Sequence, residues 1–191
     1  FLTREQASSY GIPPEFFVRA VGRTRDVSGD ALTPDDLEAL EAAGRPTHLL
    51  SLDGKPAEAY PLAIREYLKR GEAMGIPERP VVMSRRPWYK MEVRSTPAFL
   101  FAYLGRRNVR FIRNDAGVVP LTCLLCVYPL SSTPHYANAL WEVLRDPQTV
   151  ANLQLVGKSY GDGAIKVEPR ALERLPLPED AIARAGLVVP Q

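Results

Sequence analysis

The chain has 191 residues, of which 46% are hydrophobic, so it can bury a real core as one large domain or two small ones. Its 24 basic and 22 acidic residues leave a formal net charge of +2, which excludes a uniformly basic or acidic protein. No apolar run approaches the roughly 20 residues that a transmembrane helix needs, so we expect a soluble chain. The 18 prolines and 13 glycines predict short elements joined by turns rather than a helical bundle.

The chain termini and the cysteines favour an intracellular fragment. Residues 1–6 carry neither an initiating methionine nor the regions of a signal peptide, so we expect a piece cut from a longer protein. Cys123 and Cys126 lie in an apolar run that does not resemble a disulfide framework, which favours a reducing cytoplasm. Zinc needs four ligands, and His48 and His135 are far away in the sequence, so we expect two core cysteines with thiols on opposite faces of a strand.

The first 79 residues predict mainly helices. Thr3 and Gln6 form a capping box that begins the first helix, and glycines end several of the others. The predicted elements are helices over 3–11, 33–44 and 61–71, a helical turn over 14–17 and a buried strand over 48–52 that ends at the Asp53-Gly54 turn.

After Pro80 the pattern changes to strands, so we place an internal boundary there. Strands are predicted over 81–83, 88–93, 98–104, 108–113 and 118–128, with a turn at 114–117 and a break in the last strand at Pro120. Two helices over 133–156, a flexible loop over 157–163, a strand over 164–167, a short helix over 169–175 and a proline-rich tail complete the chain. The sequence therefore predicts an α+β fold, with a mixed, mostly antiparallel sheet flanked by short helices.

Basic residues gather in the stretch 79–114, which has nine of them against one acid, Glu92. Guanidinium groups beside aromatic rings can pair with phosphates, bind guanine edges or stack on bases, so the stretch is typical of a polyanion-binding face, with nucleic acid as the first candidate. The alternative for any single arginine is a charged sheet edge, and Trp88 is either a stacking residue or part of the core. The candidate DNA-binding residues are Arg85, Arg86, Trp88, Tyr89, Lys90, Arg94, Arg106, Arg107, Arg110 and Arg113.

A second candidate site is the loop 157–163. With Lys158, Tyr160 and the nearby Lys166 it can hold a backbone phosphate through its amides, or it is a plain connection.

Two other functions remain open. Asp35, Asp53 and Lys55 match the loose spacing of Mg²⁺-dependent nucleases, in which two carboxylates hold the metal and a lysine assists the attacking water. Asp35, however, falls in the first turn of a predicted helix and Asp53 in a turn, where acids have ordinary structural roles. The second alternative is a protein interaction module whose arginines contact acidic partners. We assign no catalytic residue and no metal site to the chain itself.

Seven segments carry a family pattern: 1–6, Tyr10-Gly-Ile-Pro, 67–72, Arg86-Pro-Trp-Tyr-Lys, 113–117, 157–163 and 165–178. In their order and spacing they resemble the C-terminal half of N6-adenine DNA methyltransferases of the TaqI-like class, which belong to restriction-modification systems. In that family an N-terminal domain binds S-adenosylmethionine and methylates a flipped adenine, while a C-terminal target recognition domain chooses the DNA sequence.

The resemblance implies a division of labour. Residues 80–191 would read double-stranded DNA, and residues 1–79 would lead to the catalytic domain of the same protein. The catalytic Asn/Asp-Pro-Pro-Tyr/Phe motif is missing, because Ile12-Pro13-Pro14-Glu15 has neither the polar side chain nor the ring. The resemblance thus implies no methylation by this chain alone, and S-adenosylmethionine only in the parent protein. A specificity subunit of a multi-chain restriction system is a related alternative.

Overall fold

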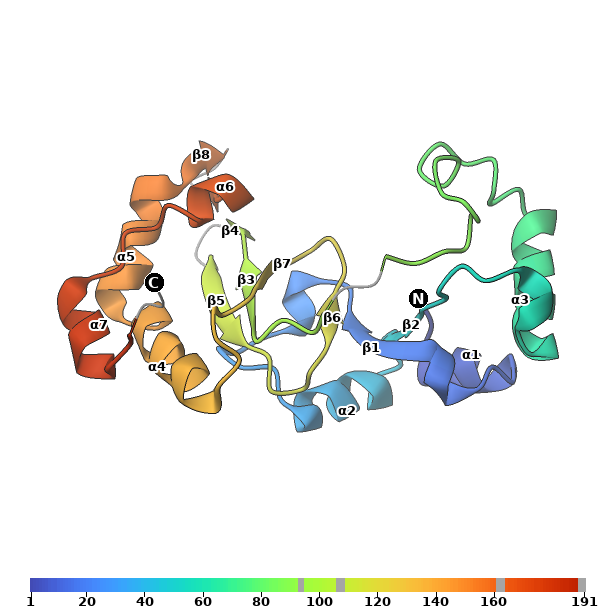
Figure 1. Ribbon diagram of the computed structural model, residues 1–191, viewed down its shortest axis with the longest axis horizontal. Coiled ribbons are helices and arrows are strands. Elements are labelled where there is room, and N and C mark those ends of the chain that lie inside the picture. The colour runs from blue at the N-terminus through green and yellow to red at the C-terminus, as the bar shows by residue number, and fades with distance from the viewer. Residues whose placement is uncertain (93–94, 106–108, 161–163, 189–191) are drawn as a thin grey trace. The chain divides into compact units, whose positions relative to one another are not determined.

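The computed structural model of the protein describes residues 1–92, 95–105, 109–160 and 164–188 (Figure 1). The chain divides into two compact units, and neither is continuous in sequence. The first unit comprises Phe1–Val21 and Leu37–Ser95, and the second comprises Gly22–Asp36 and Thr96–Gln191. The chain therefore crosses from one unit to the other after residues 21, 36 and 95.

The first unit is mainly helical, as its start signals predict. Its elements are α1 (Arg4–Ser9), η1 (Pro14–Phe16), β1 (Phe17–Val21), β2 (His48–Leu50), η3 (Ala57–Ala59) and α3 (Leu62–Ala73), together with the end of α2 (Pro34–Ala42). The capping box is confirmed, because Thr3 Oγ1 accepts from the Gln6 amide at 3.2 Å while Gln6 Oε1 accepts from the Thr3 amide at 3.0 Å. α3 continues past the predicted stop at Gly71, and the positive φ falls at Gly75 instead.

The core of the first unit lies between α3 and the segment around β2. β1 and β2 pair antiparallel, with Phe17 opposite Leu50. Ile64 and Leu68 lie one turn apart on the buried face of α3, as the helical spacing predicts. They pack in one cluster with Ile12, Leu52 and Tyr60, all of them at most 6% exposed.

The second unit combines small sheets with helices. Its elements are η2 (Thr24–Asp26), β3 (Phe99–Ala102), β4 (Leu104–Gly105), β5 (Arg110–Arg113), β6 (Val119–Pro120), β7 (Leu125–Val127), α4 (Pro134–Leu144), α5 (Pro147–Val156), β8 (Lys158–Tyr160), β9 (Ala164–Lys166), α6 (Pro169–Leu172) and α7 (Glu179–Ala185), with the start of α2. β3 lies between β5 and β7, and β9 lies between β4 and β8, all in antiparallel pairs.

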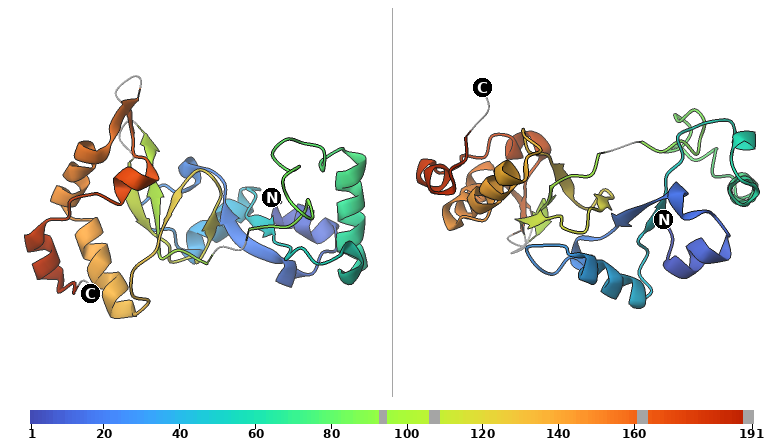
Figure 2. Two further views of the ribbon diagram at one scale, coloured as in Figure 1. Left: turned by 45° about the horizontal axis from the view of Figure 1, so that its top comes forward. Right: turned by 60° about the horizontal axis from the view of Figure 1, so that its bottom comes forward.

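The core of the second unit is built on β3, which is buried over its whole length. The ring of Phe99 stacks on Trp141 of α4, with centroids 5.7 Å apart. α4 and α7 lie side by side in both views of Figure 2. Ala139 and Val143 of α4 pack in one cluster with Ala181 of α7 and with Leu187, which follows that helix.

The structure confirms the predicted α+β fold, with mostly antiparallel strands and short helices. The strands, however, are divided among several small sheets. The domain boundary that the sequence predicts at Pro80 stays a prediction.

Several predicted elements are wrong. The strand predicted over 81–83 and the described part of that over 88–93 are turns and irregular chain, because no strand within the described ranges pairs with them. The strand predicted over 118–128 is divided into β6 and β7. Residues 158–160 of the predicted loop form β8 through pairing with β9, and the predicted tail contains α7. β1 was not predicted, because its pairing partner β2 lies about thirty residues away in sequence.

The cysteines do not share a strand. Cys123 lies in a turn before β7 and Cys126 lies within it, and both are half-buried rather than core residues. Burial raises the pKa of the Cys123 thiol. Within the described ranges, no helix is long and apolar enough to cross a membrane.

Candidate nucleic-acid interface

The predicted DNA-binding residues are divided between the two units. Residues 79–95 of the basic stretch belong to the first unit and residues 96–114 to the second. Arg94, Arg106 and Arg107 lie outside the described residues, as does the side chain of Tyr160. We therefore describe the candidates of each unit separately.

The basic candidates of the first unit lie on one folded loop, residues 79–90, called the basic loop below. Its backbone is closed by its own hydrogen bonds: the amides of Val82 and Met83 both donate to the carbonyl of Arg79, at 2.8 and 2.9 Å. The Arg85 amide donates to the carbonyl of Val82 at 2.9 Å. Arg86 Nη1 adds bonds to the carbonyls of Met83 and Arg85. The loop thus has a defined shape without belonging to a sheet.

The aromatic residues of the loop anchor its base. Trp88 and Tyr89 pack against the core cluster of the first unit, and both are half-buried. Tyr89 Oη donates to the carbonyl of Lys55 at 2.7 Å. The Trp88 ring lies so close to α3 that a Cβ at Gly71 would be 2.6 Å from its Cη2 atom. This placement favours the core alternative for Trp88, and a DNA contact by either ring stays a prediction.

The cations of the loop are exposed and lack acidic partners. Arg79, Arg85, Arg86 and Lys90 are all exposed, and no described carboxylate forms an ion pair with any of them. The stem of Lys90 crosses the backbone of Gly54, where an added Cβ would stand 2.8 Å from the lysine Cδ. Because Arg86 also bonds the loop backbone, Arg79, Arg85 and Lys90 have the charged groups most available for a ligand.

The two described candidate arginines of the second unit, Arg110 and Arg113, have partners within the protein. Arg110 is 19% exposed, and its Nη2 donates to the carbonyl of Val27 at 2.6 Å while Nε donates to that of Gly29 at 3.3 Å. Arg113 pairs with Asp115 at 2.9 Å. Hydrogen bonds to carbonyls and an ion pair take up guanidinium donors, so Arg110 and Arg113 are weaker candidates for DNA contact than the cations of the basic loop.

Two lysines of the second unit form a smaller basic pair. Lys158 of β8 and Lys166 of β9 are opposite each other in the antiparallel register. Like charges directly opposite are unfavourable unless an anion lies between them. The carboxylate of Glu168 provides negative charge beside this pair, because its Oε1 lies 2.8 Å from Lys166 Nζ. The hydrogen bond from Lys166 lowers the pKa of the Glu168 carboxyl. Lys158 is exposed and Lys166 is half-buried.

The residues of the nuclease alternative do not build a metal site. Asp53 pairs with Lys55 at 2.8 Å and accepts a hydrogen bond from Tyr60 Oη. These two partners hold the Asp53 pKa at about 2. Asp35 lies in the first turn of α2, in the segment assigned to the second unit. In the described part of the chain no three His, Cys, Asp or Glu residues cluster as metal ligands.

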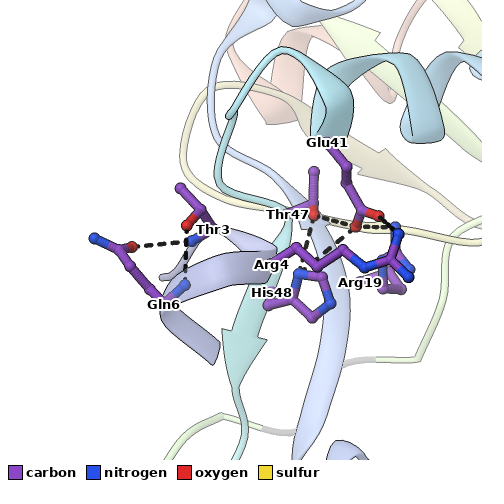
Figure 3. Close-up of polar contacts among 7 residues, drawn as sticks. All are labelled: Thr3, Arg4, Gln6, Arg19, Glu41, Thr47 and His48. Atoms are coloured by element: carbon purple, nitrogen blue, oxygen red, sulfur yellow. Dashed lines mark hydrogen bonds and ion pairs between the residues drawn. The ribbon is translucent and has the colours of Figure 1, made fainter. Parts of the chain in front are cut away.

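A buried polar cluster in the first unit was not predicted. Glu41, whose side chain is 6% exposed, accepts hydrogen bonds from Arg19 and from Thr47 Oγ1, the latter at 2.6 Å (Figure 3). His48 Nδ1 and Arg4 Nη1 lie 3.6 and 3.8 Å from the same carboxylate. Burial, followed by the charge of Arg19, lowers the pKa of His48. The cluster joins α1, α2, β1 and β2, so its function is structural. From the sequence alone, Glu41 cannot be distinguished from the exposed acidic residues of the same helix.

The exposure of Val81 and Met83 was not predicted. The sequence places them in a predicted strand, where they would be half-buried, but the structure exposes 80% of Val81 and 54% of Met83 at the tip of the basic loop. The flanking Pro80, Ser84 and Arg85 were the available signal for a turn.

Known proteins of one class match this chain: the family model described as "Type II methyltransferase M.Eco57I, C-terminal domain" matches residues 1–189. The chain belongs to this family, and the predicted resemblance to a methyltransferase C-terminal domain is confirmed. A curated relative, the type II methyltransferase M.AccI of Acinetobacter calcoaceticus, is 23% identical over 171 residues. The match covers 88% of this chain and 31% of that relative, so the chain spans about a third of its length.

Proposed function

We propose that this chain binds double-stranded DNA sequence-specifically, as the target recognition part of an adenine-N6 methyltransferase of a restriction-modification system. The parent protein would use S-adenosylmethionine in a catalytic domain outside these residues and act in the cytoplasm. Family membership supports the methyltransferase context. The observation that carries DNA binding is the basic loop, whose exposed cations have no acidic partner among the described residues.

The division of labour follows from the chemistry. Ile12-Pro13-Pro14-Glu15 only superficially resembles the catalytic motif, and Ile12, which is 6% exposed, packs in the core of the first unit, which supports placing the adenine pocket in another domain. Cations held on a preformed loop lose little entropy when they neutralise phosphates. By fixing the register of the duplex, the chain would let the catalytic domain extrude its target adenine.

Salt-dependent duplex binding tests this proposal. We expect the 191-residue chain to bind a mixed-sequence duplex, with an affinity that falls steeply as salt rises. Arg85→Ala and Lys90→Ala should each reduce the log–log salt slope by about 0.9 if the side chain neutralises one phosphate. Binding measured by fluorescence anisotropy across a salt series gives these slopes.

Lys69→Ala is the matched control for Lys90→Ala. Lys69 is an exposed lysine of the same unit, but it pairs with Glu66 at 3.1 Å, so its removal should change the slope far less. Absence of duplex binding at low salt would overturn the proposal, and binding to an acidic protein instead would favour the interaction module. Selection from randomised duplexes then tests sequence specificity, and methylation of the selected site by the parent protein tests adenine as the target.

A further inference from the structure

The tip of the basic loop exposes apolar side chains where a DNA-binding loop normally carries polar ones. Val81 is 80% exposed and Met83 is 54% exposed, two residues apart on one turn. Burial of apolar side chains is favourable, so a surface that covers both of them gains stabilisation that the free chain lacks. Single exposed apolar residues are ordinary, but an apolar pair rimmed by charged residues marks an interaction surface.

Backbone hydrogen bonds close the tip of the loop and anchor its base. The hydrogen bonds that the amides of Val82 and Met83 donate to the carbonyl of Arg79 fold residues 79–83 into a turn. At the base of the loop the Lys90 amide donates to the carbonyl of Pro87 at 3.0 Å, and the Met91 amide donates to that of Leu52 at 2.9 Å. A loop that is already closed by a turn and anchored at its base loses little conformational entropy when its side chains bind a ligand.

Cations flank the apolar tip on both sides, as a surface that contacts phosphates requires. Arg79 precedes it and Arg85 and Arg86 follow it, all exposed. A duplex groove has the complementary pattern, with two phosphate backbones on either side of stacked, largely apolar base pairs. Proteins that enter the minor groove use basic residues together with apolar wedges such as Phe, Leu, Ile, Met or Pro, which unstack a base step and bend the duplex.

We propose that Val81 and Met83 form a wedge that enters the minor groove of the bound duplex and opens one base-pair step. This inference rests on the proposed DNA binding and adds a mode of contact to it. Arg79 and Arg85 neutralise the phosphates on the two sides of the opened step. The wedge supplies binding free energy that does not depend on salt, because it removes apolar surface from water without releasing counterions.

Unwinding of plasmid DNA tests the wedge without knowledge of the preferred sequence. A wedge that opens a base step unwinds the duplex, so ligation of a nicked plasmid in the presence of the chain should trap a changed linking number. Val81→Ser together with Met83→Ser should bind roughly tenfold more weakly with an unchanged salt slope. At equal occupancy this double variant should leave the linking number unchanged.

Val188→Ser is the matched control, since Val188 is 78% exposed in the other unit, outside the basic loop. It should bind and unwind like the wild type, and circular dichroism melting checks that each variant is folded.

The outcomes separate the two proposals. If the wild type binds DNA without unwinding it, or if the double variant unwinds as well as the wild type, the wedge is wrong while DNA binding stands. Failure of the wild type to bind any duplex removes the proposed function and the wedge with it. An apolar and basic tip also suits anionic lipid, so vesicles of phosphatidylserine and phosphatidylcholine form a separate arm. Loss of vesicle binding by the double variant, with duplex binding unchanged, would assign the tip to lipid and overturn the wedge.

Discussion

At the scale of single residues, the partner of a charged group decides what it can bind. The sequence shows nine bases between 79 and 114, but it does not show that Arg110 bonds the carbonyls of Val27 and Gly29 while Lys90 has no acidic partner among the described residues. Those carbonyls are about eighty residues away in sequence, so no local pattern reveals them. Composition therefore identifies the basic stretch but does not show which of its cations have partners, and its role in DNA binding stays a prediction.

Acid should destabilise the first unit through His48. Burial and the charge of Arg19 lower the His48 pKa in the folded protein, although Glu41 lies 3.6 Å away and acts in the opposite direction. Below about pH 6.5 the unfolded chain binds a proton that the folded chain resists, so stability falls as pH drops from about 6.5 to the folded pKa and then levels off. Urea unfolding at about pH 8 and about pH 5.5 measures this loss.

His48→Gln isolates the contribution of the imidazole. This variant should lose less stability than the wild type over the same pH range, because the groups that titrate elsewhere are common to both proteins. Equal losses in the two proteins would show that His48 has the same pKa in the folded and unfolded chains.

At the scale of elements, local signals specified helices better than strands. The capping box at Thr3 and the spacing of Ile64 and Leu68 lie within single helices, and both were predicted correctly. β1 and β8 exist because distant or adjacent segments pair with them, and residues 81–83 remain a turn because none does. Strand formation depends on partners that a sequence window does not contain.

The contact between α3 and the basic loop gives an element-scale prediction. Ala in place of Gly normally stabilises a helix by about 1 kcal/mol. At Gly71, however, the new Cβ would lie 2.6 Å from Cη2 of Trp88, and overpacking costs about 1–3 kcal/mol. We therefore expect Gly71→Ala to lower the stability of the chain by about 1 kcal/mol in thermal unfolding.

A double-variant cycle with Trp88→Phe attributes this loss to the ring. Phenylalanine is shorter and lacks the clashing atom, so Gly71→Ala should cost less in the Trp88→Phe background than in the wild type. If the Gly71→Ala chain is more stable than the wild type, the basic loop and Trp88 move away from the new Cβ without a loss of stability, and the prediction is wrong.

At the scale of the whole molecule, each unit is assembled from segments that are far apart in sequence. The second unit takes residues 22–36 from the N-terminal part of the chain. The Leu32 amide donates to the carbonyl of Arg113 and the Arg113 amide to that of Asp30, both at 2.8 Å. Leu32 is 1% exposed and Val27 is 3% exposed. The pattern change at Pro80 marks a shift in composition, whereas these contacts connect residues on both sides of it.

A fragment of residues 80–191 should therefore be much less stable than the whole chain. It lacks the burial of Val27 and Leu32, worth about 1.5–3 kcal/mol each, and it leaves the backbone groups of Arg113 without their partners. Total stabilities of domains are about 5–15 kcal/mol, so this loss is a large share. A lower melting temperature by circular dichroism is the expected result, and a synthetic peptide of residues 22–36 should raise it in a concentration-dependent way.

The same peptide with Leu32→Ser separates specific docking from a general effect of added peptide. It keeps the length and charge of the segment but loses the buried side chain, so it should raise the melting temperature far less. If the fragment alone melts as cooperatively and at the same temperature as the whole chain, Pro80 is a true domain boundary and residues 22–36 are dispensable for the fold of the second unit. If only the unaltered peptide restores stability, the portion that begins at Pro80 depends on the N-terminal segment, and studies of DNA recognition require the whole chain.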